Sequence, residues 1–260
     1  MPARKPLSCR YPWAHDYARL IREWRKIHRV AGLSMKVYGE AFDYPLYILE
    51  SRHPDKSRPN MMLSAGIHGD EPAPPVAILE WVTRNPKTVQ KLNVVIFPCL
   101  NPWGIVNNNR MDAEGRDLNR TYHDDKVLQT LAHRKALANR RFAAALMLHE
   151  DYDGKGAYVY EVARKKPFWA SKIILAASRF VPVDSRPRIE HRKASKGVIR
   201  RDIKLISMPD RPEALHLYYN HAERAFTVET PSEYFLNDRV EAHVAGIQTC
   251  ATLCLKEHRQ

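Results

Sequence analysis

Two residues three apart in the sequence, His68 and Glu71, could bind one metal ion together. Of the 12 histidines, only His68 is followed by a glutamate three places later. An imidazole nitrogen and a carboxylate oxygen at this spacing can converge on an ion where a strand ends in a turn. Gly66 and Gly69 flank His68 and favour a tight turn. The pair alone is weak evidence, because a surface histidine beside a capping glutamate is the more common outcome.

A third metal ligand is available from another part of the chain. His149 directly follows the apolar segment Ala143–Leu148. Two histidines and one glutamate, with a fourth position open to water, form a catalytic zinc arrangement. The pattern therefore predicts one zinc ion per chain, bound by His68, Glu71 and His149. Taken alone, His149 could equally be a residue that only ends a strand.

Glu229 is the candidate for proton transfer. It follows the apolar segment Ala225–Val228 and precedes Thr230 and Pro231, so its carboxylate should lie at the edge of a sheet. Beside a metal-bound water, such a carboxylate could act as general base and then as general acid. The alternative is an exposed glutamate without a role.

A polar loop between two expected strands could bind a substrate. The residues Asn101-Pro-Trp-Gly104 turn the chain after the strand expected at Leu92–Phe97, and Arg110 and Asp117-Leu-Asn-Arg120 follow. Guanidinium and amide groups are suited to binding a carboxylate through two hydrogen bonds. A solvated basic loop would have a similar composition.

These polar groups share a position relative to the expected strands. Ligands in open α/β sheets bind at the carboxyl ends of strands. The candidate metal ligands, the polar loop and Glu229 all come at or just after the end of an expected strand. Alternating or continuous apolar residues predict strands at Met35–Tyr38, Leu46–Glu50, Asn60–Ala65, Leu92–Phe97, Phe142–Leu148, Tyr158–Glu161 and Ala225–Thr230.

Helical spacing of apolar residues fills the segments between these strands. Helices are expected at Tyr17–Ala31, Val76–Thr83, Asp124–Arg140, Phe168–Phe180, Ala214–Arg224 and Val240–Leu255. Strands that alternate with helices predict an α/β sandwich, and we expect residues 1–260 to form a single domain. The segment Arg186–Lys204 departs from the pattern, because it has eight Lys or Arg, two acids and few apolar residues. We expect it to be an exposed excursion.

Composition narrows the classes of protein. No apolar run is long enough to cross a membrane, and the basic N-terminus is not followed by an apolar segment. The four cysteines lack metal-binding or disulfide spacing, so we expect reduced thiols and a cytoplasmic protein without a membrane partner. The net charge of +13 attracts anions in general. A non-enzymatic binder of anionic polymers is one hypothesis, although Arg186–Lys204 lacks interleaved aromatic residues, and we expect no specific nucleic acid partner.

Taken together, the motifs resemble those of the metallocarboxypeptidase superfamily. The resemblance covers roughly Met61 to Ser232, with the motifs in the order of the family. The matching residues are His68-Gly-Asp-Glu71, Asn101-Pro-Trp-Gly104, Arg110, Asp117-Leu-Asn-Arg120, Leu148-His149 and Thr227-Val-Glu-Thr-Pro231. The resemblance implies a mixed, mostly parallel sheet of about eight strands, with helices on both faces.

The resemblance also implies a role for each matching residue. His68, Glu71 and His149 would bind zinc. Glu229 would activate the zinc-bound water and pass its proton to the leaving amine. The remaining matching residues would act around them: Asp117 would orient His68, Arg110 would stabilise the oxyanion, and Asn119 and Arg120 would bind the substrate carboxylate.

Two features depart from the family pattern. Many members have a tyrosine on a mobile loop some twenty residues before the catalytic glutamate, whereas this chain has Ser207-Met-Pro-Asp-Arg there. Tyr218 and Tyr219 lie nearer to Glu229, on an expected helix. Glu150 and Asp151 also follow His149 and would add negative charge beside the metal.

The resemblance implies hydrolysis of an amide bond next to a free carboxylate. The substrate would be a small peptide, with a murein peptide as one version, or an acylated amino acid. The rival hypothesis is a deacylase of the aspartoacylase and succinylglutamate desuccinylase type, which shares the first zinc motif and Asp117–Arg120. Such enzymes usually have a β domain after the catalytic glutamate, and only 31 residues follow Glu229 here, which favours the peptidase. The sequence does not indicate the oligomeric state or the group released.

Overall fold

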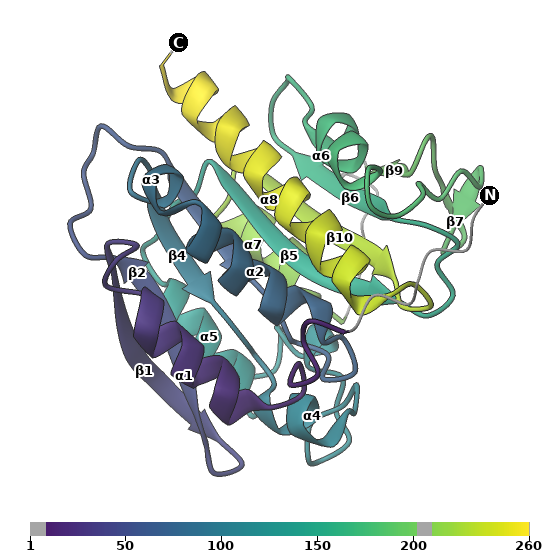
Figure 1. The fold of residues 1–260 in the computed structure, drawn as a ribbon. Coiled ribbons are helices and arrows are strands. Elements are labelled where there is room, and N and C mark those ends of the chain that lie inside the picture. Colours follow the sequence, from purple (N-terminus) through teal and green to yellow (C-terminus); the bar gives the residue numbers. More distant parts are fainter. Residues whose placement is uncertain (1–8, 202–209, 260) are drawn as a thin grey trace.

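The computed structural model describes residues 9–201 and 210–259 and contains one eight-stranded sheet between two layers of helices (Figure 1). The strands of the main sheet run in the order β1-β2-β4-β3-β5-β10-β6-β9. Their bounds are β1 Leu33–Ala41, β2 Tyr44–Ser51, β3 Asn60–Ser64, β4 Asn93–Phe97, β5 Ala144–Asp151, β6 Tyr158–Ala163, β9 Val198–Arg200 and β10 Arg224–Pro231. A separate hairpin pairs β7 Arg188–Ile189 with β8 Arg192–Lys193.

The four central strands, β4, β3, β5 and β10, are parallel to one another. The hairpin β1–β2 joins one side of them antiparallel, and β6 joins the other side antiparallel. This arrangement confirms the predicted mixed, mostly parallel sheet. The carboxyl ends of the four central strands therefore meet at one edge, which we call the carboxyl edge.

Helices cover both faces of the sheet, as predicted (Figure 1). One face is covered by α1, α2, α6 and α8, and the opposite face by α5 and α7. Three short helical turns, α3, α4 and η1, lie in the connections. The bounds are α1 Tyr17–Ile27, α2 Ala73–Arg84, α3 Pro86–Val89, α4 Pro102–Asn107, η1 Leu118–Arg120, α5 Leu128–Leu137, α6 Ala170–Ala177, α7 Glu213–Asn220 and α8 Leu236–His258.

The central strands are apolar on both faces because helices bury both. Met61, Met62 and Leu63 of β3 are all fully buried, although they point alternately to opposite faces. Leu146 and Met147 of β5 likewise belong to the two different apolar clusters on either side of the sheet. Polar residues on these strands consequently lie mainly near the two ends of each strand.

The expectation of an exposed excursion at Arg186–Lys204 is only partly right. Ile189, Ala194 and Ile199 are buried in a small apolar cluster with Tyr158, and β9 extends the main sheet beside β6. The apolar positions are few, but their burial in this cluster and the pairing of β9 with β6 hold the segment against the end of the sheet. Residues 202–204 lie outside the described residues.

No helix within residues 9–201 and 210–259 combines the length and the apolar character needed to cross a membrane. Cys9, Cys99, Cys250 and Cys254 are all free thiols.

Three histidines on helices, His133, His216 and His243, are partly or fully buried. His133 of α5 is fully buried, and its Nδ1 atom lies 2.6 Å from the hydroxyl of Tyr122. Burial lowers the pKa of His133 well below its ordinary value, and burial also lowers the pKa of His216 to about 4 and that of His243 to about 3. These three imidazoles are therefore neutral in the folded protein at neutral pH.

The depressed pKa values predict a loss of stability in mild acid. In the unfolded chain each histidine takes up a proton near its ordinary pKa of about 6.5, so the unfolded state binds more protons below that pH. The free energy of unfolding is then lost as the pH falls from about 6.5 toward the folded pKa values, with a limiting slope of about 1.4 kcal/mol per pH unit for each histidine. Urea unfolding between pH 7.5 and 5 should show this loss, and a His133→Gln variant should show a shallower slope than the parent. An equal slope in the variant would contradict the assignment.

Candidate metal centre

The turn after β3 carries His68 and Glu71 to the carboxyl edge. Gly66 adopts φ +63°, a conformation that glycine accepts most readily, and a Cβ there would lie 3.1 Å from Cys99 Sγ. The turn then packs against a second loop. A Cβ on Gly69 would lie 1.9 Å from the carbonyl carbon of Gly104. The two loops can therefore pack this closely only because residue 69 has no side chain.

The second loop is fixed by Asn101. Its Oδ1 accepts a hydrogen bond from the backbone N–H of Gly104 at 2.9 Å, which caps α4, and its Nδ2 donates to the carbonyl of Met111 at 3.1 Å. The backbone N–H of Gly69 donates to the carbonyl of Asn109 at 3.0 Å. The motif from Asn101 to Gly104 therefore holds the turn that carries His68.

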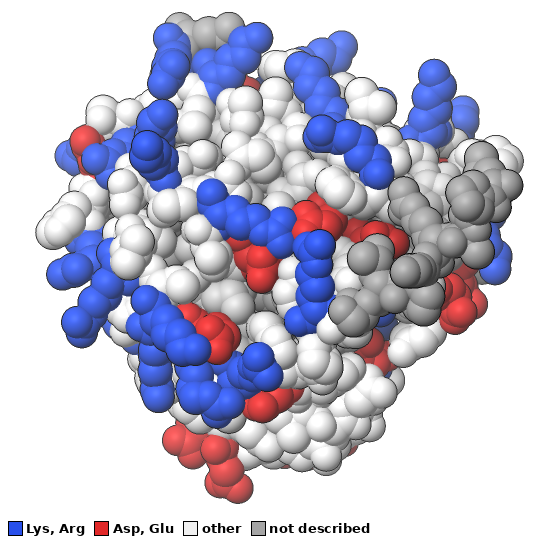
Figure 2. All heavy atoms as spheres, in the orientation of Figure 1, with Lys and Arg blue, Asp and Glu red and all other residues white. Residues whose placement is uncertain are grey.

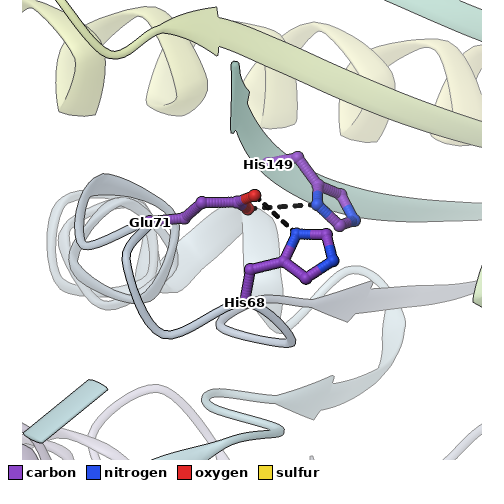
Figure 3. A group of neighbouring side chains, drawn as sticks. All are labelled: His68, Glu71 and His149. Atoms are coloured by element: carbon purple, nitrogen blue, oxygen red, sulfur yellow. Dashed lines mark hydrogen bonds and ion pairs between the residues drawn. The ribbon is translucent and has the colours of Figure 1, made fainter. Parts of the chain in front are cut away.

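The three candidate ligands lie together (Figure 3). His68 Nδ1 is 2.5 Å from Glu71 Oε1, and His149 Nδ1 is 3.0 Å from Glu71 Oε2. Their ligand atoms all lie within 4.8 Å of one another, and all three residues are buried. In Figure 3 the carboxylate points between the two imidazoles, which approach it from different parts of the chain.

The donor set fits a metal ion such as zinc. Two imidazole nitrogens and one carboxylate leave a fourth position for water. Although Glu71 Oε2 lies near His149 Nδ1, it has no well-aligned hydrogen-bond partner among the described residues, while it is fully buried. A buried carboxylate oxygen without such a bond is costly, and an ion bound by the three residues would satisfy it.

The electrostatics of the three residues also favour a cation. Burial lowers the pKa of His68, but Glu71 and Asp117 outweigh burial and raise it to about 9. Burial raises the pKa of Glu71, but His68 and His149 outweigh it, and the net shift is strongly downward. Glu71 is therefore a buried anion, and in the absence of a metal a proton on an imidazole would balance its charge.

Asp117 and Arg110 lie behind His68. Asp117 Oδ1 is 3.2 Å from His68 Nε2, and Arg110 Nη2 donates to Asp117 Oδ2 at 3.0 Å. The bond to Asp117 leaves Nδ1 of His68 facing Glu71, as a metal-binding imidazole requires. Arg110 Nη1 also lies 3.7 Å from Glu71 Oε1, which places the guanidinium beside the candidate metal position.

Glu229 is brought to the metal position by the register of the sheet. It pairs with His149 on β5 and with Tyr158 on β6, so the three side chains form one row across neighbouring strands. Burial raises the pKa of Glu229 well above its ordinary value, and the nearby carboxylates of Glu71, Glu190 and Asp151 raise it further.

Asn119 and Arg120 lie on η1 at the same pocket. Asn119 Oδ1 accepts a hydrogen bond from the backbone N–H of Glu213 at 2.9 Å, which fixes the orientation of the amide. Arg120 Nη1 donates to the carbonyl of Asn119 at 3.0 Å. Seven of the eight predicted site residues line one cavity of about 500 Å³, and Asp117 supports it from behind: the seven are His68, Glu71, Arg110, Asn119, Arg120, His149 and Glu229.

The sequence analysis missed one side of this cavity. Tyr158, Tyr160 and Val162 alternate along β6 and line the cavity together with Glu190 and Arg192 from the β7–β8 hairpin. The alternation along β6 was the available signal, but nothing local indicated that the hairpin folds back to the carboxyl edge. In all, seven carboxylates and four arginines line the cavity, and a bound cation would reduce this negative excess.

The acidic pair after His149 is divided between two environments. Glu150 lines the cavity, accepts a hydrogen bond from the backbone N–H of Ala73 at 3.1 Å and pairs with Arg239. Burial raises the pKa of Glu150 to about 7, and Arg239 opposes that shift. Asp151 lines the cavity and accepts a hydrogen bond from the hydroxyl of Tyr158 at 2.9 Å.

The mobile tyrosine of the family has no counterpart on α7 at this cavity. Tyr218 is buried, and Tyr219 lines a hollow at the other edge of the sheet. The segment Ser207-Met-Pro-Asp-Arg lies largely outside the described residues, which resume at residue 210. Tyr152, with 56% of its surface exposed, does line the cavity and follows His149 by three residues.

Comparison with known proteins agrees with this geometry. Residues 57–156 match the family model described as the succinylglutamate desuccinylase/aspartoacylase catalytic domain, which is less than half of the chain. A search of curated proteins finds no match.

Solved structures share the fold over nearly the whole chain. A candidate metallopeptidase from Shewanella baltica is 20% identical, with 93% of each chain covered and a TM-score of 0.82. A second from Shewanella amazonensis is 23% identical, with 92% of this chain and 94% of that one covered and a TM-score of 0.80. A metallo-carboxypeptidase from Burkholderia cenocepacia is 15% identical, with 94% and 70% covered and a TM-score of 0.69. The resemblance to metallocarboxypeptidases is thus confirmed for the fold, and the matches support a metal-dependent hydrolase.

The metal centre can be tested by composition. Purified protein should contain about one zinc ion per chain by elemental analysis. His149→Ala should lose most of the metal, because a ligand is removed, whereas His53→Ala changes an exposed histidine and should keep it. Folded parent protein without metal after zinc loading, or equal metal content in the two variants, would rule out the site.

Proposed function

We propose that this chain is a zinc-dependent hydrolase that cleaves an amide bond next to a free carboxylate. The observation that carries the proposal is the convergence of His68, Glu71 and His149 in a cavity that also contains Glu229. We propose that residues 1–260 act as one catalytic domain in the cytoplasm. The substrate would be a small peptide, and a murein peptide is one version.

The roles of the residues follow from their places. Zinc bound by His68, Glu71 and His149 would supply a Lewis acid and a water of lowered pKa. Glu229, in the row beside His149, would take the proton of the attacking water and pass it to the leaving amine. Arg110, next to the metal position, would stabilise the negative charge that develops on the scissile carbonyl oxygen.

Substrate orientation would come from η1. Asn119 and Arg120 line the cavity at a distance from the row of strand residues, and a substrate carboxylate bound there would place the adjacent amide toward the metal. A guanidinium can bind a carboxylate through two parallel hydrogen bonds, which fixes direction as well as position.

A second candidate function is favoured by the family model. The match of residues 57–156 to the succinylglutamate desuccinylase/aspartoacylase catalytic domain supports hydrolysis of an N-acyl amino acid. The same metal ligands and the same carboxylate-binding residues would serve that reaction, because both substrates have an amide next to a carboxylate. The two candidates differ in the acyl group and not in the chemistry.

Removal of the general base should separate turnover from metal binding. Glu229→Gln should retain zinc and lower kcat by about 10²- to 10⁴-fold, because the amide cannot accept the proton. Glu233→Gln makes the same substitution at an exposed glutamate four residues later and should keep kcat within about twofold. An unchanged kcat in Glu229→Gln would remove its proposed role.

One panel of substrates can test both the proposed binding of a substrate carboxylate by Asn119 and Arg120 and the choice of substrate. Zinc-loaded protein should be assayed by mass spectrometry on C-terminal peptides of each charge class, murein peptides and N-acyl amino acids. Arg120→Ala should raise KM for free carboxylates by about tenfold or more and have little effect on C-terminally amidated analogues, because one charged hydrogen-bond donor is lost. An equal rise in KM for free carboxylates and amidated analogues would contradict carboxylate binding by Arg120. Turnover confined to N-acyl amino acids would favour the deacylase.

A further inference from the structure

A large hollow among the described residues lies at the opposite edge of the sheet from the candidate metal centre. It measures about 1150 Å³ and is lined by residues at the beginnings of β3, β4, β5 and β10, among them Asn60, Asn93 and Phe142. We call this side the amino edge. None of its residues lines the cavity of about 500 Å³ that contains the candidate metal ligands, which we call the metal cavity. The proposed hydrolysis therefore makes no use of this hollow.

Three smaller hollows continue the large one. A hollow of about 480 Å³ shares Asn60, Asn93 and Arg141 with it, and one of about 220 Å³ shares Arg58 and His258. A fourth, of about 450 Å³, shares residues with the smallest at the end of α8. The depressions therefore follow one another along the amino edge, which suits an extended ligand better than a small ion.

The surface of these hollows is strongly basic. Eleven lysines and arginines line the four hollows, against four carboxylates, so the excess of seven accounts for about half of the net charge of +13. The metal cavity has the opposite balance, with seven carboxylates and four arginines. Figure 2 shows Lys and Arg side chains along the upper rim of this face, where α8 ends.

Most of these cations have no acidic partner in the part of the chain that the structure describes. All four carboxylates are used in ion pairs: Glu50 with Lys36 and Arg140, Asp55 with Arg58, and Glu223 and Glu257 with Lys165.

Seven cations remain without a carboxylate within ion-pair distance among the described residues. At one end of the row of hollows are Arg52, Lys56, Arg141 and Arg164, and at the other end are Lys91, Lys256 and Arg259. Uncompensated charges that are spread over one hollowed surface favour a partner with regularly spaced anions.

An aromatic ring distinguishes between kinds of polyanion. Tyr219 lines the large hollow and has 45% of its surface exposed. Its neighbour Tyr218 is buried under the guanidinium of Arg164, which lies 4.5 Å from the ring centre. An exposed ring beside a basic groove can stack on an unpaired base, an interaction that an acidic polypeptide does not offer.

We propose that the amino edge binds the phosphodiester backbone of single-stranded nucleic acid without sequence specificity. None of the four hollows is lined by residues 186–201, the described part of the basic segment Arg186–Lys204. Binding would use the charges of both ends of the row of hollows, and a base would stack on Tyr219. The proposal is independent of the metal centre and of the hydrolysis proposed there.

The salt dependence of binding gives a quantitative test. If the seven unpaired cations each contact a phosphate, the plot of log K against log salt concentration should have a slope of about −5 for a single strand. Fluorescence anisotropy with a labelled mixed-sequence oligonucleotide would measure it. Neutralising Arg52, Lys56 and Arg141 with glutamine should make the slope shallower by about 2 and weaken binding by about tenfold or more at low salt.

Matched variants distinguish binding at this surface from binding that follows only the net charge of the protein. The triple change Lys91→Gln, Lys256→Gln and Arg259→Gln should act like the first triple. The same loss of charge at Arg19, Arg22 and Arg25, exposed on α1 and outside the hollows, should change the affinity less than twofold. Equal losses in all three triples would overturn the proposal, because binding would then follow the net charge. Thermal melts of each variant should confirm that it is folded.

Two further measurements identify the partner and the site. Tyr219→Ser should weaken oligonucleotide binding by about tenfold and leave binding of polyglutamate unchanged. Tighter binding of polyglutamate than of the oligonucleotide would overturn the proposal in favour of an acidic protein. Removal of metal with a chelator should leave the affinity unchanged, and loss of binding on chelation would place the anion at the metal centre and also overturn the proposal.

Discussion

The site depends on the interaction of the buried Glu71 carboxylate with the two imidazoles of His68 and His149. A buried charge is costly unless other groups compensate it, and here the compensation comes from His68 on the same turn and from His149 on β5. These contacts require β3 and β5 to be neighbours and to end at the same edge, which the parallel pairing of the two strands provides. The metal centre is thus a consequence of the strand order as much as of the three residues.

The same pairing determines the rest of the catalytic row. Because β10 lies parallel to β5, with Glu229 opposite His149, a shift of one residue would turn the carboxylate to the other face of the sheet. The loops are also tightly packed, because a side chain on Gly69 would overlap the backbone of Gly104, and a side chain on Gly104 would overlap Asn101 and the carbonyl of Asn109. Residues that never touch a substrate therefore determine the distances on which the chemistry depends.

The sequence predicted most of what is local and little of what is distant. Strand ends, the turn with His68 and the order of the motifs could be read from apolar runs and spacing. The main elements were therefore predicted, and so were three candidate ligands that the structure brings together. The hairpin with Glu190 was expected to be solvated, because its few apolar residues, such as Ile189, are separated by charges. The negative charge of Glu150 was expected near the metal, and Glu150 does line the cavity. Its pairing with Arg239, which is 89 residues away in the sequence, had no local signal.

The two edges of one sheet have opposite charge balances, and the physical reason lies in what each edge must hold. The cavity at the carboxyl edge is lined by more carboxylates than arginines, so the excess of lysine and arginine lies on other surfaces. If that excess served only solubility, it would be expected to be mixed with acids and spread evenly. It is instead concentrated along connected hollows whose few carboxylates are already paired, beside an exposed tyrosine. Such an arrangement costs repulsion in the free protein, and a bound polyanion would relieve it.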